Sequence, residues 1–141
     1  MRLWHKDLVP YLPTPQLISQ WRECCLIART VSNIGTPNHI LVNKIMDYPI
    51  SHLYWYTQLV LREMNKRKFR FSEESLKKFL YYMEIIDENF KNPVLYDDLF
   101  CNWHNHNYMD QCASNLQEKY ECGGIKEKDY EVLCEFFKDY L

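Results

Sequence analysis

The sequence predicts an all-α protein that folds as one compact domain. Only three glycines occur among 141 residues, and two of them are adjacent, which is too few for the many tight turns of an all-β fold. Hydrophobic residues make up 47% of the chain and aromatic residues 16%, so the chain can form a packed core and is not disordered. Because this length suits one ordinary domain, we expect residues 1–141 to form a single helical unit.

Prolines dominate the start of the chain. Pro10 and Pro13 disfavour a helix there, so we expect residues 1–13 to run extended and to pack against or between the helices. Thr14 then serves as the N-cap of the first helix, with Pro15 at its first position. These signals give the domain an extended amino-terminal segment.

The first helix should bury a stripe formed by Leu17, Trp21 and Ala28, which recur at helical spacing. We expect it to end near Asn33, with Gly35 as a left-handed C-cap. Further proline and capping signals predict helices over residues 36–46, 51–68, 72–90, 109–121 and 126–140.

Two of these helices carry clear start or stop signals. Thr36 and Pro37 repeat the N-cap and proline start. Ser72 is a good N-cap because acidic residues follow it in the first helical turn, where the helix dipole favours negative charge.

Charge is distributed unevenly along the chain. Residues 1–72 hold ten Lys and Arg against four acidic residues, a formal charge of +6, whereas residues 73–141 hold seven against fifteen, a charge of −8. A basic half is typical of a protein with a polyanionic partner, and an acidic half indicates a solvated or partner-facing surface. Unspecific surface charge is the plainer alternative.

The composition also bears on location. No apolar run approaches the roughly 18 residues that a membrane span needs, and the first residues lack the apolar core of a signal peptide. We therefore expect a cytoplasmic protein without a membrane partner. In that compartment the six cysteines should be reduced, and most should be packed thiols.

One short stretch of the first helix could carry chemistry. Arg22 and Glu23 lie away from the apolar stripe, so a carboxylate and a guanidinium could point into one cleft. There the carboxylate could move a proton while the cation holds a phosphate. An ordinary solvated helix face is the alternative.

The stretch from Leu8 to Glu23 resembles the opening of the phage-type pyrimidine-dimer DNA glycosylases, the endonuclease V type. Those proteins begin with a terminal residue followed by arginine and an aliphatic residue, here Met1-Arg2-Leu3. Their first helix carries an aromatic-Arg-Glu triplet, here Trp21-Arg22-Glu23. A shorter similarity covers Arg62 to Phe69, so the resemblance spans roughly the first half of the chain.

The resemblance implies a small helical enzyme with glycosylase and abasic-site lyase activity and no cofactor. It implies that the amine of Met1 attacks C1′ of the damaged nucleotide and forms an imine with the opened sugar. Glu23 would assist the proton transfers, and Arg2 and Arg22 would hold backbone phosphates. β-Elimination would then nick the strand.

Amine chemistry supports this role for the terminus. An α-amine has a pKa of about 7.7–8.0, well below about 10.4 for lysine, so more of it is neutral near pH 7. Arg2 beside it should lower that pKa further by like-charge repulsion. Because Arg2 is too bulky for removal of the initiator methionine, Met1 itself should supply the amine.

The expected partner is double-stranded DNA with a damaged base, which phosphate contacts must hold first. Trp4 and His5 adjoin the terminus and could offer a stacking surface, whereas the aromatic residues at 52–56 suit the core better. A run such as 66–70 could also be a solvated helix end. The expected DNA contacts are Arg2, Trp4, His5, Lys6, Gln16, Arg22, Lys44, Lys66, Arg67, Lys68 and Arg70.

Two alternatives stay open at this point. Cys101, His104, His106 and Cys112 are residue types that bind zinc, but their spacing matches no recognised finger, and we expect no metal. A noncatalytic helical module is the other alternative. It would bind nucleic acid through its basic half and a protein through its acidic half.

Overall fold

The computed structural model describes residues 2–34 and 39–140, and within these ranges every regular element is a helix. The predicted all-α fold is confirmed. The elements are η1 (Lys6–Tyr11), α1 (Thr14–Ile34), α2 (Ile40–Met46), α3 (Ser51–Lys66), α4 (Glu73–Ile86), η2 (Tyr96–Asp98), α5 (His106–Glu121) and α6 (Glu127–Tyr140), where η marks a 3-10 helix. The expected cap at Gly35 and helix start at Thr36 and Pro37 lie outside the described residues.

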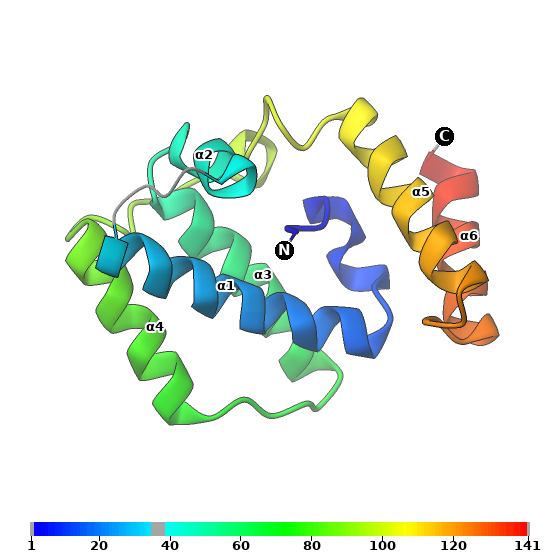
Figure 1. The fold of residues 1–141 in the computed structure, drawn as a ribbon, viewed down its shortest axis with the longest axis horizontal. Helices are drawn as coiled ribbons and strands as arrows, with labels where there is room; N and C mark the ends of the chain where they lie inside the picture. Colours follow the sequence, from blue (N-terminus) through cyan, green and yellow to red (C-terminus); the bar gives the residue numbers. More distant parts are fainter. Residues whose placement is uncertain (1, 35–38, 141) are drawn as a thin grey trace.

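The helices form two groups with the amino-terminal segment between them (Figure 1). In the larger group, α1 packs against both α3 and α4. In the smaller group, α5 packs against α6. The short helix η1 contacts α3 on one side and α6 on the other, so the start of the chain joins the two groups.

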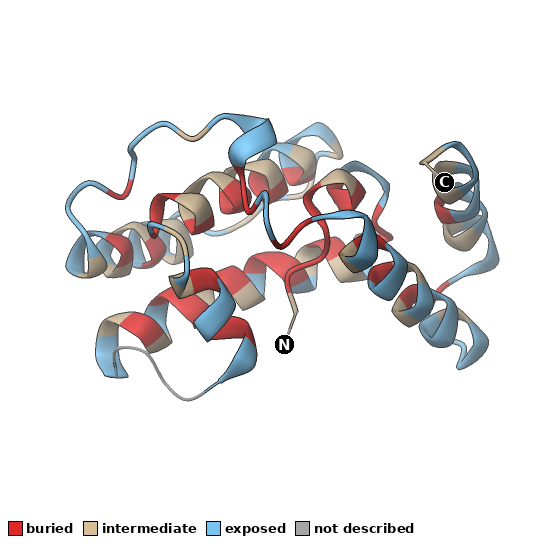
Figure 2. Ribbon diagram, turned by 90° about the horizontal axis from the view of Figure 1, so that it is seen from above, coloured by how far each residue is buried: buried red, intermediate tan, exposed pale blue. Residues whose placement is uncertain are grey.

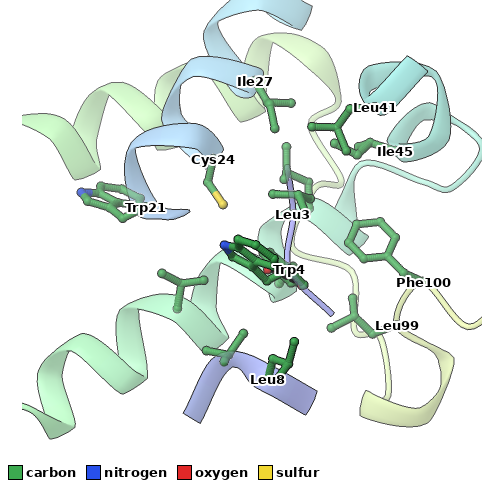
Figure 3. Packing of buried hydrophobic residues seen from close by; sticks show 14 of the residues in the cluster. Leu3, Trp4, Leu8, Trp21, Cys24, Ile27, Leu41, Ile45, Leu99 and Phe100 are labelled. Atoms are coloured by element: carbon green, nitrogen blue, oxygen red, sulfur yellow. Dashed lines mark hydrogen bonds between the residues drawn. The ribbon is translucent and has the colours of Figure 1, made fainter. Parts of the chain in front are cut away.

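The amino-terminal segment lies in the protein's core. Leu3 and Leu8 are fully buried, and Figure 2 shows this stretch as buried between the helices. In Figure 3, Leu3 and Trp4 lie among side chains from α1 and from the loop before α5, such as Cys24 and Phe100. The expectation that this segment packs between helices is confirmed.

The expectation that the whole segment is extended is wrong. Residues 6–11 form the helix η1 despite Pro10. The side chain of His5 accepts a hydrogen bond from the Asp7 backbone N–H, and the Leu8 N–H donates to the His5 carbonyl at 2.9 Å. These local bonds satisfy the first backbone groups of a tight turn, which sequence spacing did not reveal.

The capping signals located several helix ends well. Ser72 caps α4, since its side chain accepts from the Ser75 N–H. Helix α1 begins one residue earlier than the Thr14 cap implied, because the Pro13 carbonyl already accepts from the Leu17 N–H at 3.0 Å. Helix α3 ends two residues early, since Lys68 adopts a left-handed φ of 65°.

The remaining boundaries differ more. Helix α4 ends at Ile86 rather than near Phe90, because the backbone of Asp87 is extended. The Asp87 side chain accepts a hydrogen bond from the Asn89 N–H in the turn that follows. Helix α5 starts at His106, three residues before the predicted position, with Asn105 as its N-cap.

The six cysteines are all unpaired thiols. Cys24 is buried as expected, and burial raises its pKa to about 12. Cys101, Cys122 and Cys134 are exposed, so the expectation of mostly packed thiols is wrong for the second half. In the described ranges, no helix is both long and apolar enough to cross a membrane.

Candidate active-site pocket

A pocket of about 490 Å³ lies between α1 and α5, beside the start of the chain. Its lining residues are Arg2, Trp4, Gln16, Ser19, Gln20, Glu23, Asn115, Glu118, Lys119 and Cys122. Four of these are site residues predicted from the sequence: Arg2, Trp4, Gln16 and Glu23. The fold therefore brings together the start of the chain and the predicted carboxylate.

Two polar stripes form the facing walls of this pocket. On α1 the lining positions are 16, 19, 20 and 23, which share one helix face because they are separated by three, four and seven residues. Positions 115, 118, 119 and 122 repeat this spacing along α5 and its C-cap. We call these surfaces the α1 wall and the α5 wall. Ser19, Gln20 and the whole α5 wall were not predicted from the sequence, although the spacing of their polar residues is a signal that the sequence contains.

Gln20 fixes the backbone at the start of the chain. Its side chain is 1% exposed; the amide oxygen accepts from the Trp4 N–H and the amide nitrogen donates to the Arg2 carbonyl, both at 2.8 Å. From α3, the Tyr56 hydroxyl donates to the Trp4 carbonyl at 2.6 Å. The backbone on both sides of Leu3 is thus held to α1 and α3, next to the pocket.

Glu23 has an enclosed carboxylate oxygen that lacks a donor among residues 2–34 and 39–140. No described residue offers a hydrogen bond to its Oε2, and the same holds for Oε1 of Gln16, two turns away on the same wall. An enclosed acceptor without a donor is costly, and more so on a carboxylate. The α1 wall therefore presents two acceptors that a donor group in the pocket could satisfy. Met1 lies outside the described residues, so its role as nucleophile stays a prediction.

Arg2 projects beside Trp4 at the pocket. Its guanidinium carbon lies 5.3 Å from the centroid of the Trp4 ring, a cation–π arrangement. Trp4 is only 6% exposed, so its ring offers little surface on which a base could stack. In this structure Trp4 mainly supports Arg2 and the core.

Comparison with known proteins places the chain in a family. The family model described as pyrimidine dimer DNA glycosylase matches residues 1–77, more than half of the chain. The chain belongs to the pyrimidine dimer DNA glycosylase family. No curated protein and no solved structure matches the chain. The family match includes the start of the chain and the α1 wall, and it ends before α5.

In this glycosylase-family chain, His5 and Lys6 are structural residues, which corrects the expectation that they contact DNA. His5 is 1% exposed. The Lys6 ammonium donates to the carbonyls of Tyr96 and Leu99, at 2.6 and 2.8 Å, and burial lowers its pKa. An ammonium enclosed by carbonyls of the chain's own second half is not available to phosphate.

Arg67 also serves the fold. Its guanidinium pairs with Glu63 at 2.8 Å and donates to the carbonyls of Leu12 and Pro10, at 2.7 and 3.0 Å. These bonds attach the end of η1 to α3, so Arg67 is corrected from a DNA contact to a structural one. The predicted DNA-binding residues with exposed side chains are Arg22, Lys44, Lys66, Lys68 and Arg70.

The expected joint placement of Arg22 and Glu23 in one cleft is wrong. Glu23 lines the pocket, whereas Arg22 is exposed and is not part of the lining. Neighbouring residues on an α-helix point about 100° apart, so only one of the two can face α5.

The Cys and His residues of the second half do not form a metal site. The Nδ1 of His104 accepts from the Lys6 N–H at 2.9 Å, which places the proton of the neutral ring on Nε2 and leaves no free lone pair for a metal. Burial, followed by the nearby His5, lowers the pKa of His104 to about 2. Within the described ranges, no three His, Cys, Asp or Glu side chains are grouped to hold an ion.

Proposed function

We propose that this protein is a DNA glycosylase with abasic-site lyase activity, acting on pyrimidine dimers or a related base lesion in duplex DNA. One observation carries the proposal. Arg2, the residue next to the terminal amine, is held by Gln20 and lines the same pocket as Glu23, whose Oε2 is enclosed without a donor from the described residues. The family to which the chain belongs supports the same activity.

In the proposed reaction the neutral amine of Met1 attacks C1′ of the damaged nucleotide. The N–C1′ bond forms as the glycosidic bond breaks, and the bonding pair leaves with the base, which takes up a proton. The terminal amine suits this step because α-amines ordinarily have a pKa of about 7.7–8.0, which leaves an appreciable neutral fraction near pH 7.

Glu23 acts as the proton carrier in this proposal. Its carboxylate takes a proton from the newly bonded nitrogen and passes it to the ring oxygen of the sugar as the ring opens, so that the nitrogen lone pair completes the imine. Water then takes a proton from C2′, the C2′–H pair forms a C2′=C3′ double bond, and the C3′–O bond breaks, so that its electron pair leaves with the phosphate. Water hydrolyses the imine and restores the amine.

The exposed cations Arg22, Lys44, Lys66, Lys68 and Arg70 would hold the DNA backbone, together with Arg2 at the pocket. Contacts with phosphate set the position of the duplex and supply the salt-dependent part of the affinity. Reaching C1′ inside a duplex requires local opening, which is easiest at a damaged base. Damaged double-stranded DNA is therefore the proposed partner.

Borohydride trapping on a duplex with one abasic site tests the proposal. The unmodified protein should give a covalent adduct, because borohydride reduces the imine to a stable amine. Selective acetylation of the terminal amine near neutral pH should abolish the adduct, whereas acetylation should leave DNA binding by the exposed lysines and arginines largely intact.

Two results would contradict the proposal. Undiminished trapping after the block would remove the terminal amine from the mechanism. Tight binding of the same duplex by the unmodified protein, without any adduct or strand cleavage, would favour the noncatalytic module.

A further inference from the structure

We propose that one face of α6, together with Tyr11, is a docking surface for a positively charged segment of another protein that also carries apolar side chains. The surface, which we call the α6 groove, is formed by Tyr11, Asp129, Val132, Glu135, Phe136 and Asp139. It shares no lining residue with the pocket between α1 and α5, and the proposed reaction makes no use of it.

The α6 residues of the groove share one side of the helix. Positions 135, 136 and 139 lie three, four and seven residues after Val132, which is helical spacing. Tyr11 extends from the end of η1 to this face, where its ring stacks on Phe136 with the ring centroids 4.5 Å apart. A hollow of about 440 Å³ lies here, and a second hollow of about 250 Å³ shares Tyr11 and Val132 with it. The two hollows therefore form one continuous groove.

The floor of the groove is apolar and open to solvent. Val132 is 50% exposed and Tyr11 is 40% exposed. The helix as a whole is lightly packed, since Figure 2 shows most of α6 as exposed or half-buried. Single exposed apolar side chains are common on protein surfaces, but several that adjoin in one hollow are typical of an interaction site.

The rim of the groove is acidic. Asp129, Glu135 and Asp139 bring three carboxylates, and none of them pairs with a cation within residues 2–34 and 39–140. Arg67 brings a cation to one end of the lining, but its guanidinium is already engaged by Glu63 and by two backbone carbonyls. Carboxylates around an apolar floor complement a partner that presents lysine or arginine beside apolar side chains.

The same charge disfavours DNA as the occupant. Three carboxylates would repel the phosphates that dominate the affinity of a protein for a duplex. The exposed cations that we propose as DNA contacts lie on α1, on α2 and within residues 66–70, and none of them lines the groove. DNA and a protein partner would thus use separate parts of the surface.

Two synthetic peptides and three variants test the docking surface. The first peptide has about 14 residues, with leucines at helical spacing and lysine elsewhere, and the second carries glutamate in place of each lysine. The rim variant is Glu135→Lys/Asp139→Lys, and Val132→Ser alters the floor. The matched control Glu84→Lys/Glu88→Lys makes the same change in net charge at exposed residues outside the groove. Fluorescence anisotropy of the labelled peptides measures binding to the full chain.

We expect the lysine peptide to bind the wild type and the glutamate peptide not to bind. The rim variant should weaken binding of the lysine peptide by about tenfold or more, because it reverses two complementary charges. Val132→Ser should weaken it by about threefold or more, because apolar contact with the floor is lost. The control should bind within about twofold of the wild type, since exposed charges far from the peptide are screened by salt.

Several results would overturn the docking surface. Equal weakening by the rim variant and the control would show attraction to net charge alone. No binding by the wild type, or binding that neither groove variant weakens, would remove the role of the groove. Self-association of the wild type without peptide, lost in the rim variant, would assign the groove to a second copy of the chain instead. Circular dichroism checks that the variants, which change exposed side chains only, remain folded.

Discussion

The two walls of the pocket share a spacing of polar residues but are held in very different ways. Helix α1 buries seven residues, several of them against α3 and α4, whereas α5 buries three and α6 only Leu133. Elements with few buried contacts open more easily than those inside a packed core. The α1 wall is therefore the rigid one, suited to bond-making geometry, and the α5 wall can adjust to what enters the pocket.

Polar contacts with the amino-terminal segment supply much of what holds the α5 wall. The Tyr108 hydroxyl of α5 donates to the Leu3 carbonyl, and His104, just before α5, accepts from the Lys6 N–H. From α3, His52 accepts from the Phe100 N–H at 3.1 Å. Buried histidines thus contribute to holding the segment before α5, whereas α1 has the larger share of apolar packing.

The largest expected effect comes from comparing the carboxylate of the α1 wall with the carboxylate of the α5 wall. Glu23→Gln should slow abasic-site cleavage by about 10²–10⁴-fold, because it removes the proposed proton carrier. Glu118→Ala on the α5 wall should change that rate by less than about tenfold. Single-turnover cleavage of an abasic-site duplex measures both. Similar losses in the two variants would mean that the walls do not differ in chemical role.

Acid should loosen the α5 wall before the α1 wall. The pKa of His104 is about 2 in the folded protein, below its ordinary value of 6.5, so the unfolded chain binds a proton that the folded protein does not. Burial lowers the pKa of His5 and His52 as well. Protonation of His104 should thus lower stability as the pH drops from about 6.5 toward 2, at up to about 1.4 kcal/mol per pH unit, and His5 and His52 should act in the same direction.

Amide hydrogen exchange, measured as a function of pH, tests whether the α5 wall opens before the α1 wall. Amides of α5 and α6 should lose protection at a higher pH than those of α1 and α3. A His104→Gln variant should show a shallower acid dependence. Uniform loss of protection across all helices would show instead that the two walls open as one unit.

Gln20 holds the amino-terminal segment against α1 through two hydrogen bonds. Removing these bonds should impair the α1 wall even though its apolar packing is kept. Gln20→Ala leaves the buried Trp4 N–H without a partner, at a cost of about 1–3 kcal/mol, and removes the donor to the partly buried Arg2 carbonyl. Abasic-site cleavage should also fall by up to about 10²-fold, since the proposed reaction requires a well-positioned amino-terminal segment.

Tyr56→Phe is the milder companion to Gln20→Ala, because it removes one hydroxyl from the same cluster. It should lower the free energy of unfolding by about 1 kcal/mol and leave most of the cleavage rate. Denaturant unfolding and single-turnover cleavage distinguish the two variants. An unchanged cleavage rate in a folded Gln20→Ala protein would show that Gln20 does not position the amine.

The smallest effects belong to the exposed cations outside both walls. Lys66→Ala and Lys68→Ala should each reduce the salt dependence of DNA binding by about one phosphate contact and leave stability nearly unchanged. Arg67→Ala, between them, should lower stability instead, since it removes the bonds that hold Leu12 and Pro10. The reverse pattern would show that our division between surface and structural cations is wrong.

Features that depend on neighbouring residues in the chain could be predicted from the sequence. Ser72 as a cap and the apolar stripe of α1 follow from neighbouring residues, and both are confirmed. The burial of Lys6 could not be predicted in this way, because the carbonyls that enclose it belong to Tyr96 and Leu99, about ninety residues along the chain. A lysine near a basic terminus has the same local pattern whether it is solvated or enclosed.

The residues of the candidate site also divide into those that local sequence predicts and those that only the tertiary fold reveals. Arg2 and Glu23 were predicted from motifs at the start of the chain, and the pocket contains both. The spacing of polar residues marks the α5 wall in the sequence, but only the tertiary fold shows that it lies opposite α1. Gln20 was missed for a different reason: a polar residue on a helix looks solvated until the backbone that it binds is placed beside it.

The side chain of Lys119 on the α5 wall brings a primary amine into the pocket lining, whereas the proposal uses the terminal amine of Met1. Mass spectrometric mapping of the borohydride-trapped adduct distinguishes them. We predict that the reduced sugar is attached to the peptide that begins at Met1, and that a Lys119→Ala variant traps abasic-site DNA as the wild type does. Attachment to Lys119, or to any other lysine, would contradict the account.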